Sequence, residues 1–392
     1  MRDFPYLRGV PKKYLFDGCK LLWHRDRLLD YLVGKQVMPL HIDMGIHKGC
    51  NIKCKYCYGL YQKPSTEYIP THRLIRLAQE AKEVGVRSIA VIGDGEPTMN
   101  KGLYTFIAAA KNLLLDVSVA TNGLLLNEDR IKRLTENLVW LRFNISAVSK
   151  YDEIHGTKGG LKKFNEIIKL AVKYGMKNDC TIGLQAVLIP EVFDQVVELA
   201  WAARAWQVDY LVIKQFSDPG ESIPVQFDMD EYVKVKRRLE IAEDLSTTDT
   251  RIIAKWSAMK DSRNITKDKK WDFDACIDLP LIFQISGDGT CYPCGYLFGK
   301  EEFCYGNIIT QNLKEILASN RYWDIIQRVK NTPLAQLCKG QCRHCETNKF
   351  VDVATKLYEK CNSVDDTLIE MCGSAKQYQR MLLNEPLHVN FV

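Results

Sequence analysis

Three cysteines lie within eight consecutive residues near the start of the chain, in the stretch GCNIKCKYCYG that contains Cys50, Cys54 and Cys57. Thiolates bind soft metals, but a structural zinc site takes four ligands and normally shows a second pair nearby. A disulfide framework takes an even number of cysteines and an oxidising compartment. The triplet fits neither pattern, so its chemistry requires a fourth partner that the stretch itself does not supply.

A [4Fe–4S] cluster accounts for the number three. Each of its four irons takes a terminal ligand, so three thiolates leave one iron open to a substrate or cofactor. The spacing Cys50-x3-Cys54-x2-Cys57, with the aromatic Tyr56 before the last cysteine, resembles the signature of radical S-adenosylmethionine (SAM) enzymes. This resemblance implies that SAM chelates the open iron. It also implies reductive cleavage of SAM to a 5′-deoxyadenosyl radical, which abstracts hydrogen from a substrate.

A second stretch supports the resemblance. IGDGEPT at 92–98 is similar to the Gly-Gly-Glu motif of the family, with Asp94 in place of the first glycine. The resemblance implies that backbone around Gly95, together with Glu96, meets the amino group of SAM, because a carboxylate makes charge-assisted hydrogen bonds to an ammonium group. A plain glycine–proline turn is the alternative.

Two polar residues at later strand ends are further candidates for SAM binding. By the same resemblance, Asn122 in the stretch TNG reaches a ribose hydroxyl, and Ser146 lies near the carboxylate of SAM. For both, an ordinary turn or core hydroxyl stays open. Family members often carry an arginine shortly after the fourth strand, whereas this chain has YDEIHGTKGG, in which Lys158 is the candidate substitute.

The elements expected around these residues alternate between strands and helices. Strands are expected at 40–46, 87–93, 116–122, 140–148, 180–189 and 209–216. Helices are expected at 72–84, 102–112, 128–137, 161–174 and 192–206. Each spacer is long enough for the crossover helix that parallel pairing requires. The pattern predicts an α/β fold, a partial TIM-like (β/α)6 barrel over 39–227. An N-terminal extension of residues 1–38 precedes it. The strand ends of the barrel would carry the chemistry.

A second group of cysteines follows a polar stretch at 228–275, which we expect to be a helical linker. The spacing Cys276-x12-Gly289-x4-Cys294 is similar to the start of a cysteine-rich extension called SPASM, or twitch in its shorter form, expected here over 276–350. A helical tail would follow at 351–392. In this resemblance Gly289 turns a hairpin, and one auxiliary [4Fe–4S] cluster has four ligands: Cys276, Cys294, Cys342 and Cys345.

Other uses of the late cysteines stay open. A full SPASM module holds two auxiliary clusters, but no cysteine follows Cys345 at the expected spacing. A further cluster could draw on the remaining cysteines of this region: Cys291, Cys304, Cys338, Cys361 and Cys372. A zinc site on Cys338, Cys342, Cys345 and one more cysteine is another alternative. His344 is expected to be exposed between ligands, and Cys19 and Cys180 are expected in the core.

Composition indicates an ordinary globular protein. The 392 residues are 46% hydrophobic and 26% charged, which suits a large domain with a smaller one. No apolar stretch is long enough for a membrane span and no secretory signal begins the chain, so we expect a cytoplasmic protein without a membrane partner. Its 14 cysteines would then be metal ligands or buried thiols. The net charge of +6 is modest for this size, and no basic run with interleaved aromatics indicates a nucleic-acid partner, so none is expected.

The expected substrate is a small metabolite, such as a sugar or cyclitol, that is oxidised or epimerised with the auxiliary cluster as electron acceptor. Only about 38 residues precede the first strand, fewer than the leader-recognition domain of many peptide maturases needs. A peptide or protein maturase is the alternative, and a non-catalytic iron–sulfur electron carrier is a distant one. A flavodoxin-like or ferredoxin-like protein would donate electrons. Arg142, Lys214 and Gln215 are candidate substrate contacts, whereas the sequence identifies no catalytic acid or base.

Overall fold

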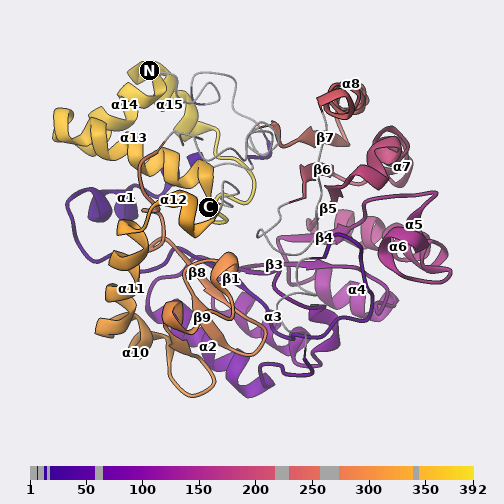
Figure 1. The fold of residues 1–392 in the computed structure, drawn as a ribbon, viewed down its shortest axis with the longest axis horizontal. Coiled ribbons are helices and arrows are strands. Elements are labelled where there is room, and N and C mark those ends of the chain that lie inside the picture. Colours follow the sequence, from indigo (N-terminus) through magenta and orange to yellow (C-terminus); the bar gives the residue numbers. More distant parts are fainter. Residues whose placement is uncertain are drawn as a thin grey trace.

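One twisted sheet organises the computed structural model, which describes residues 7, 13–15, 18–57, 65–216, 229–256, 273–338 and 344–392 (Figure 1). Its strand order is β10-β9-β8-β1-β2-β3-β4-β5-β6-β7. The first seven strands in chain order are β1 (His41–Met44), β2 (Ser88–Val91), β3 (Asp116–Thr121), β4 (Trp140–Asn144), β5 (Thr181–Leu188), β6 (Tyr210–Gln215) and β7 (Arg251–Ala254). Each of them pairs in parallel with the next. The six strands expected from the sequence are therefore present in the expected order.

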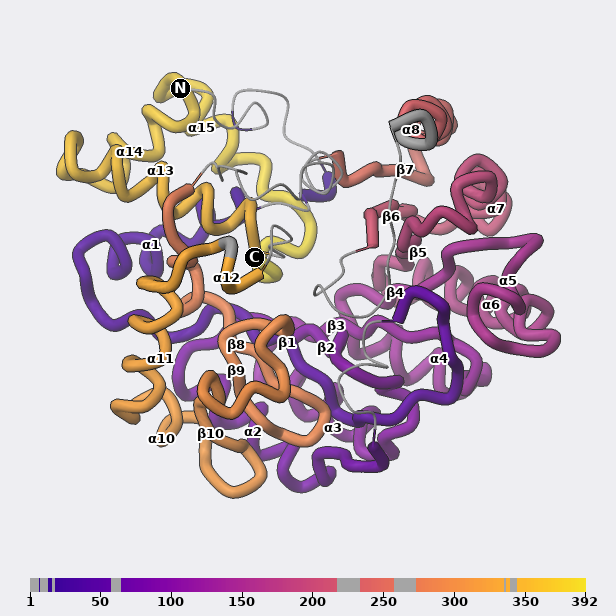
Figure 2. Tube along the Cα trace, viewed as in Figure 1, coloured from indigo at the N-terminus to yellow at the C-terminus, as the bar shows by residue number. Residues whose placement is uncertain are grey.

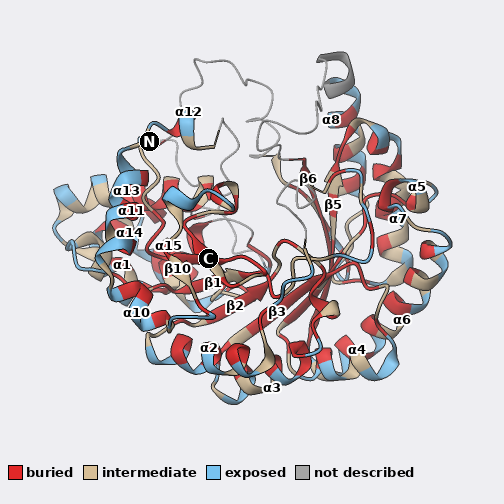
Figure 3. Ribbon diagram, turned by 60° about the horizontal axis from the view of Figure 1, so that its bottom comes forward, coloured by how far each residue is buried: buried red, intermediate tan, exposed pale blue. Residues whose placement is uncertain are grey.

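Helices cover one face of this sheet, as parallel crossovers require. They are α2 (Thr71–Glu83), α3 (Leu103–Asn112), α4 (Glu128–Thr135), α5 (Tyr151–His155), α6 (Gly160–Asn178), α7 (Val196–Trp206) and α8 (Met229–Asp244). In α2 the buried residues Leu74, Leu77, Ala78 and Ala81 recur at helical spacing, so one stripe packs on the sheet. Figure 3 shows the same division, with buried residues toward the strands and exposed residues outward.

Strand β7 differs from the expectation of a helical linker at 228–275. The sequence RIIA at 251–254 pairs with β6, which makes a seventh parallel strand. Four residues in a polar surrounding give too short a pattern to indicate a strand, and the pairing depends on the exposed edge of β6. The expected helix of this stretch is present as α8.

The hairpin expected after Cys276 is also present, and it extends the main sheet. Strand β8 (Ile282–Ile285) pairs with β1 in parallel, so that Gln284 lies opposite Asp43. Antiparallel β9 (Thr290–Tyr292) and β10 (Gly306–Asn307) follow at the edge. Gly289 turns the hairpin with φ of +84°, a backbone conformation that favours glycine. The C-terminal module and the barrel therefore share one sheet.

The remaining helices lie beside this edge and around it. They are α1 (Arg25–Leu32), α10 (Leu313–Ala318), α11 (Asn320–Asn331), α12 (Leu334–Leu337), α13 (Cys345–Cys361), α14 (Val364–Cys372) and α15 (Ala375–Leu383). Short 3-10 turns occur at Gly18–Trp23, Pro97–Met99, Pro190–Gln195, Gly295–Leu297 and Glu301–Phe303. Figure 2 shows the first helix beside the last ones. Leu22, Leu28, Phe350 and Leu368 form part of a second hydrophobic cluster there.

The last residues of the chain cover the amino ends of the strands. Asn390 donates from Nδ2 to Asp116 Oδ2 at 2.7 Å, at the first residue of β3. The ring of Phe391 packs on Trp140, the first residue of β4, with 5.5 Å between ring centroids. This end of the sheet is occupied, whereas the cysteine triplet lies at the carboxyl end. Within the described residues, no helix has the length and apolar composition that a membrane crossing needs.

Candidate active site at the carboxyl ends of the strands

The cysteine triplet lies in the loop that follows β1. Cys50 is exposed, Cys54 and Cys57 are partly buried, and none of the three belongs to a disulfide. The Cys57 N–H donates to the Cys54 carbonyl at 3.0 Å, and the Lys55 N–H donates to the Ile154 carbonyl at 2.9 Å. These bonds curl the loop and tie it to α5. Three cysteines outside any disulfide on one curled loop are a donor set that suits an iron–sulfur cluster.

Burial raises the pKa of the Cys50 thiol to about 11 and raises that of Cys54 further. Neighbouring thiols add to the effect for Cys54, because one thiolate disfavours another nearby. Without a metal the two side chains are therefore protonated at neutral pH. Thiolate is the form that ligates metal, so loading of this site must release protons.

The stretch IGDGEPT meets this loop at very close range. The Glu96 N–H donates to the Gly49 carbonyl at 2.9 Å. A Cβ atom on Gly95 would lie 2.0 Å from the His47 carbonyl oxygen and 2.7 Å from that of Gly49. Since such contacts do not occur, position 95 admits only glycine. The backbone of the IGDGEPT motif therefore packs directly against the loop that carries the cysteine triplet.

The Glu96 side chain connects this motif to the end of β3. One carboxylate oxygen accepts hydrogen bonds from Thr98 and from the Thr121 hydroxyl, at 2.5 Å for each hydroxyl, and the other accepts the Asn122 N–H at 2.9 Å. Burial raises the pKa of this carboxyl, while the same hydrogen bonds oppose the shift. The carboxylate therefore has an evident role in tying the end of β2 to the end of β3.

Asn122 lies beside the first cysteine of the triplet. Its Nδ2 donates to Asn51 Oδ1 at 2.8 Å and lies 3.8 Å from Cys50 Sγ, while its Oδ1 accepts the Leu124 N–H. Ser146 lies deeper, and its hydroxyl accepts the Val187 N–H from β5 at 2.9 Å. The structure thus brings Asn122 to the triplet, whereas the described contacts of Ser146 are with protein groups.

His155, at the end of α5, also contacts the triplet. Its Nδ1 lies 3.3 Å from Cys54 Sγ and 3.3 Å from the Tyr56 hydroxyl, and the side chain is fully buried. Tyr56 is buried too, with its ring edge against the imidazole. No sequence pattern selects this histidine, which is distinguished only by its position two residues after an acidic pair. Its proximity to Cys54 depends on the folded loop.

The second group of cysteines lies around the hairpin of β8 and β9 and at the start of α13. Burial, the Asp278 carboxylate and the nearby thiols of Cys294 and Cys338 together raise the pKa of the Cys276 thiol well above its ordinary value. Cys345 begins α13, whereas Cys342 lies outside the described residues. Cys338, which is not one of the four ligands expected from the sequence, therefore also influences Cys276 electrostatically. Among the described residues, no three Cys, His, Asp or Glu side chains form a single-ion site of the kind that zinc requires.

His344 is buried, which corrects the expectation that it is exposed between ligands. Its Nδ1 lies 3.3 Å from Asp278 Oδ2, and its Nε2 lies 3.0 Å from Gln284 Nε2. Burial alone would lower the pKa of His344, but the carboxylate of Asp278 raises it well above its ordinary value. Asn348 donates to Asp278 at 2.9 Å and to the His344 carbonyl, which completes the polar surroundings of this site.

Two of the other late cysteines, Cys291 and Cys372, lie in different parts of the fold. Cys291 belongs to the main hydrophobic cluster, whereas Cys372 belongs to the second one. One additional metal cluster therefore cannot use both. Cys19 and Cys180 are buried in the core, as expected.

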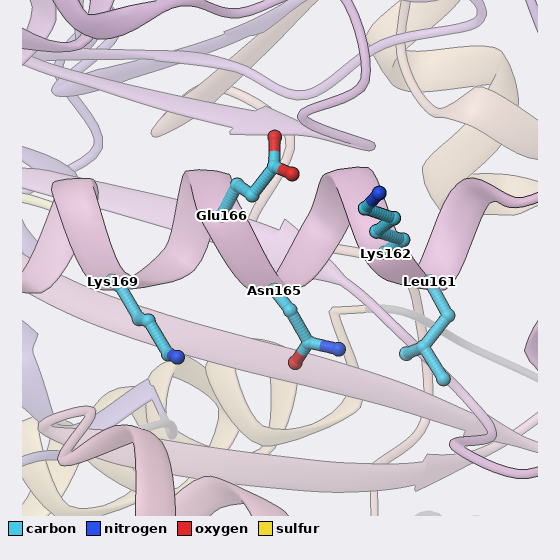
Figure 4. Close-up of a pocket in the computed structure, with 5 residues that line it drawn as sticks. All are labelled: Leu161, Lys162, Asn165, Glu166 and Lys169. Atoms are coloured by element: carbon cyan, nitrogen blue, oxygen red, sulfur yellow. The ribbon is translucent and has the colours of Figure 1, made fainter.

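A shallow depression of about 400 Å³ lies on the outer side of α6 (Figure 4). Its lining comes from one stretch of that helix: Leu161, Lys162, Asn165, Glu166 and Lys169. These side chains belong to the helical layer rather than to the inner face of the sheet. The depression is therefore separate from the site at the strand ends.

Comparison with protein families agrees with this geometry. The model of the radical SAM superfamily matches residues 44–200, and that of an iron–sulfur cluster-binding domain, SPASM, matches residues 276–346. The chain therefore carries a radical SAM domain and, C-terminal to it, a SPASM domain. It is accordingly an enzyme whose cofactors are SAM and [4Fe–4S] clusters.

Two curated relatives match most of the chain. The sporulation killing factor maturation protein SkfB of Bacillus subtilis (strain 168) is 23% identical over 75% of this chain and 68% of its own length. The cysteine-type anaerobic sulfatase-maturating enzyme of Clostridium perfringens is 24% identical over 80% of this chain and 91% of its own length. By contrast, an S-adenosylmethionine-dependent nucleotide dehydratase of a Thermoplasmatales archaeon matches 34% of the chain, which spans about half (48%) of that relative.

Solved structures share the fold. Streptococcus suis SuiB bound to the precursor peptide SuiA has a TM-score of 0.61 at 15% identity, covering 86% of this chain and 76% of that one. The structure of anSMEcpe with bound AdoMet and the Kp18Cys peptide has a TM-score of 0.56 at 18% identity, covering 85% and 99%. At such low sequence identities, the similarity shows a shared fold and nothing further.

Proposed function

We propose that this radical SAM enzyme is a maturase, which abstracts hydrogen from a residue of a peptide or protein substrate. One observation carries the proposal. The relatives that match three quarters or more of the chain are named for maturation of a killing factor and of a sulfatase. The relatives named for nucleotide substrates or cyclases match between 29% and 54% of it.

The cluster that holds SAM is proposed to bind Cys50, Cys54 and Cys57. When bound there and reduced, SAM supplies the radical that abstracts hydrogen. The chain's own part is to hold the cofactor and to exclude water. Gly95 allows the backbone of the motif to approach the cluster loop, and the Glu96 carboxylate keeps that backbone in place. We propose that this backbone meets the amino group of SAM.

Three further residues are proposed to line the SAM site. Asn122 has its amide beside Cys50, in reach of a ligand on the open iron. Ser146 and Tyr56 lie behind the loop and are buried, so their proposed contribution is to shape the site. The Ser146 hydroxyl accepts the Val187 N–H, a bond that it can keep while it donates its own proton toward the proposed SAM carboxylate.

An auxiliary cluster is proposed for the C-terminal module. Its proposed ligands are Cys276, Cys294, Cys342 and Cys345, and it would supply an acceptor for the electron left on an oxidised substrate. Cys338 is an alternative ligand, because its thiol influences Cys276 electrostatically. Iron content tests the number of clusters: about eight irons per chain support one auxiliary cluster, and about twelve support two.

The inner face of the sheet supplies candidate substrate contacts. Along β4, Arg142 alternates with Leu141 and Phe143, which belong to the core, so the guanidinium faces the inner side. The same alternation places Lys214 on the inner face of β6 and Gln215 on the helical side, where Gln215 is buried. Of the two expected contacts on β6, we therefore retain Lys214.

Anaerobic assays separate the alternatives. The reconstituted enzyme with SAM and dithionite is expected to release 5′-deoxyadenosine, and a peptide encoded beside the gene is expected to lose hydrogen, as read by mass spectrometry. Deuterium transfer from a labelled peptide to 5′-deoxyadenosine would establish the substrate directly. Transfer from a labelled sugar or cyclitol, with none from peptide, would instead favour the small-metabolite reaction. Absence of 5′-deoxyadenosine under all conditions would favour an electron carrier.

A further inference from the structure

The imidazole of His155 is held in one orientation by two protein contacts. The Ser146 N–H donates to its Nε2 at 3.2 Å. Its ring stacks on Tyr151, with 4.4 Å between centroids and 26° between planes. A backbone N–H has no acceptor character, so Nε2 must carry the lone pair. The proton of the neutral ring is thereby assigned to Nδ1.

The neutral form is the one that this position favours. His155 has no exposed surface, and such a buried position disfavours the charged ring. Protonation would also place a second N–H against the donor of Ser146. The ring therefore offers one acceptor, used by Ser146, and one donor, at Nδ1.

The donor faces a cysteine of the triplet. Nδ1 lies 3.3 Å from Cys54 Sγ, which is within range of an N–H···S hydrogen bond. It lies equally far from the Tyr56 hydroxyl, but that hydroxyl has a proton of its own and also lies beside Cys54. Both side chains can therefore donate toward the same sulfur.

We propose that His155 is a positioning residue for the first cluster, whose Nδ1–H donates a hydrogen bond to the Cys54 sulfur when that thiolate ligates iron. The inference rests on the proposed ligation by the triplet. Hydrogen bonds to ligand sulfurs help to set the potential of an iron–sulfur cluster. Reduction adds negative charge, and a donor stabilises that charge, so His155 raises the reduction potential of the cluster. It makes the electron needed for SAM cleavage easier to accept.

Two substitutions of His155 test the roles of Nδ1 and Nε2 separately. In His155→Asn the amide can reach the position of Nδ1 and keep the donor toward Cys54, while the acceptor for Ser146 is lost. In His155→Gln the amide oxygen can reach the position of Nε2 and keep the acceptor, while the donor toward sulfur is lost. A purely structural role predicts equal effects, or a larger effect for Asn.

The measurement is an anaerobic redox titration of the reconstituted full chain, followed by electron paramagnetic resonance without SAM. We expect His155→Gln to lower the midpoint potential of the triplet cluster, so that about tenfold less cluster is reduced at a fixed potential, a shift of about 59 mV for one electron. We expect His155→Asn to stay near the wild type. Tyr151→Phe keeps the stacking ring and removes a hydroxyl that makes no hydrogen bond within the described residues, so it serves as the matched control.

The outcomes are distinguishable. An unchanged potential in His155→Gln, with iron content and spectrum intact, overturns the inference and leaves the proposed ligation standing. A lower midpoint potential in Tyr56→Phe but not in His155→Gln assigns the donor to Tyr56 instead and also overturns the inference. If the wild type holds no [4Fe–4S] signal that depends on Cys50, Cys54 and Cys57, the proposed ligation itself fails. In the metal-free protein, a nitrogen-15 spectrum of His155 with the proton on Nδ1 supports the assigned tautomer independently.

Discussion

Asp94, just after β2, and Ser286, just after β8, are joined by a hydrogen bond of 2.7 Å from the serine hydroxyl to Oδ2. The other oxygen of Asp94 accepts the Gly287 N–H at 2.8 Å, and Lys48 lies 4.0 Å away. Asp94 is the residue that departs from the family motif. Its side chain links the loop proposed to meet SAM with the turn of the C-terminal hairpin.

Replacing Asp94 should therefore loosen this link. We expect Asp94→Gly, which restores the family pattern, to lower the free energy of unfolding by about 2–4 kcal/mol, since two hydrogen bonds to a buried charge are lost. Urea unfolding of the full chain measures this. Asp194→Asn, which removes an exposed ion pair with Lys150, is the control and should cost less than about 1 kcal/mol. An equally stable Asp94→Gly protein would contradict the proposed role.

A methyl group at position 95 should disturb the proposed SAM site. In Gly95→Ala the new Cβ would lie 2.0 Å from the His47 carbonyl, so the loop must shift. We expect SAM affinity to fall by at least tenfold in calorimetry while the iron content stays near that of the wild type. Gly299→Ala is the control, because no atom lies within 4 Å of its Cβ, although its φ of +80° carries a modest cost. Unchanged SAM affinity in Gly95→Ala would show that this backbone does not meet the cofactor.

Substitution of the three cysteines of the triplet should remove the first cluster and leave the auxiliary cluster in place. We expect the combined change of Cys50, Cys54 and Cys57 to alanine to abolish 5′-deoxyadenosine formation and to remove about four irons per chain. The absorbance of the auxiliary cluster should remain. Single alanine changes at Cys338 and Cys342 then identify which of the two is a ligand, because only the ligand's loss should bleach that absorbance. Loss of all iron from the triple variant would indicate one shared centre.

Stability should fall on mild acidification. Burial lowers the pKa of His24 to about 4, and Arg87 beside it acts in the same direction. The unfolded chain takes up this proton near pH 6.5, so the contribution of the neutral ring is complete above that pH. It is lost as pH falls from about 6.5 to about 4, by at most about 1.4 kcal/mol per pH unit.

His24 donates to the Val389 carbonyl at 3.1 Å, so the loss affects the anchored C-terminal residues. In His24→Gln the unfolding free energy should drop less between pH 7 and pH 5 than in the wild type, as read from urea curves at both values. An identical drop in the two proteins would place the acid sensitivity elsewhere.

The sequence predicted the barrel well because its information is local. Strands β1 to β6 are short apolar runs, and their crossover helices repeat with a clear period. The spacing of Cys50, Cys54 and Cys57 is likewise local, and so is the glycine of the hairpin turn. By contrast, β7 is four residues long, and its pairing depends on a neighbouring edge. The assignment of β8 to the same sheet depends on β1, far away along the chain.

The polar contacts of the site were the part that the sequence could not provide. His155 and His344 are single residues without a distinguishing pattern, and burial decides what each can do. The alternation of β6 could have separated Lys214 from Gln215, because neighbouring residues of a strand face opposite sides. The substrate stays a proposal, since no residue pattern on the inner face specifies one.

The pairing of β1 with β8 also constrains how the chain folds as it leaves the ribosome. One edge of β1 is satisfied early by β2, but its other partner is synthesised about 240 residues later. Through most of translation a buried strand of the finished enzyme therefore presents an open edge, a template for pairing with the wrong strand or with another nascent chain. Closure of that edge by β8, and assembly of the proposed auxiliary cluster, must then wait until the last part of the polypeptide has emerged.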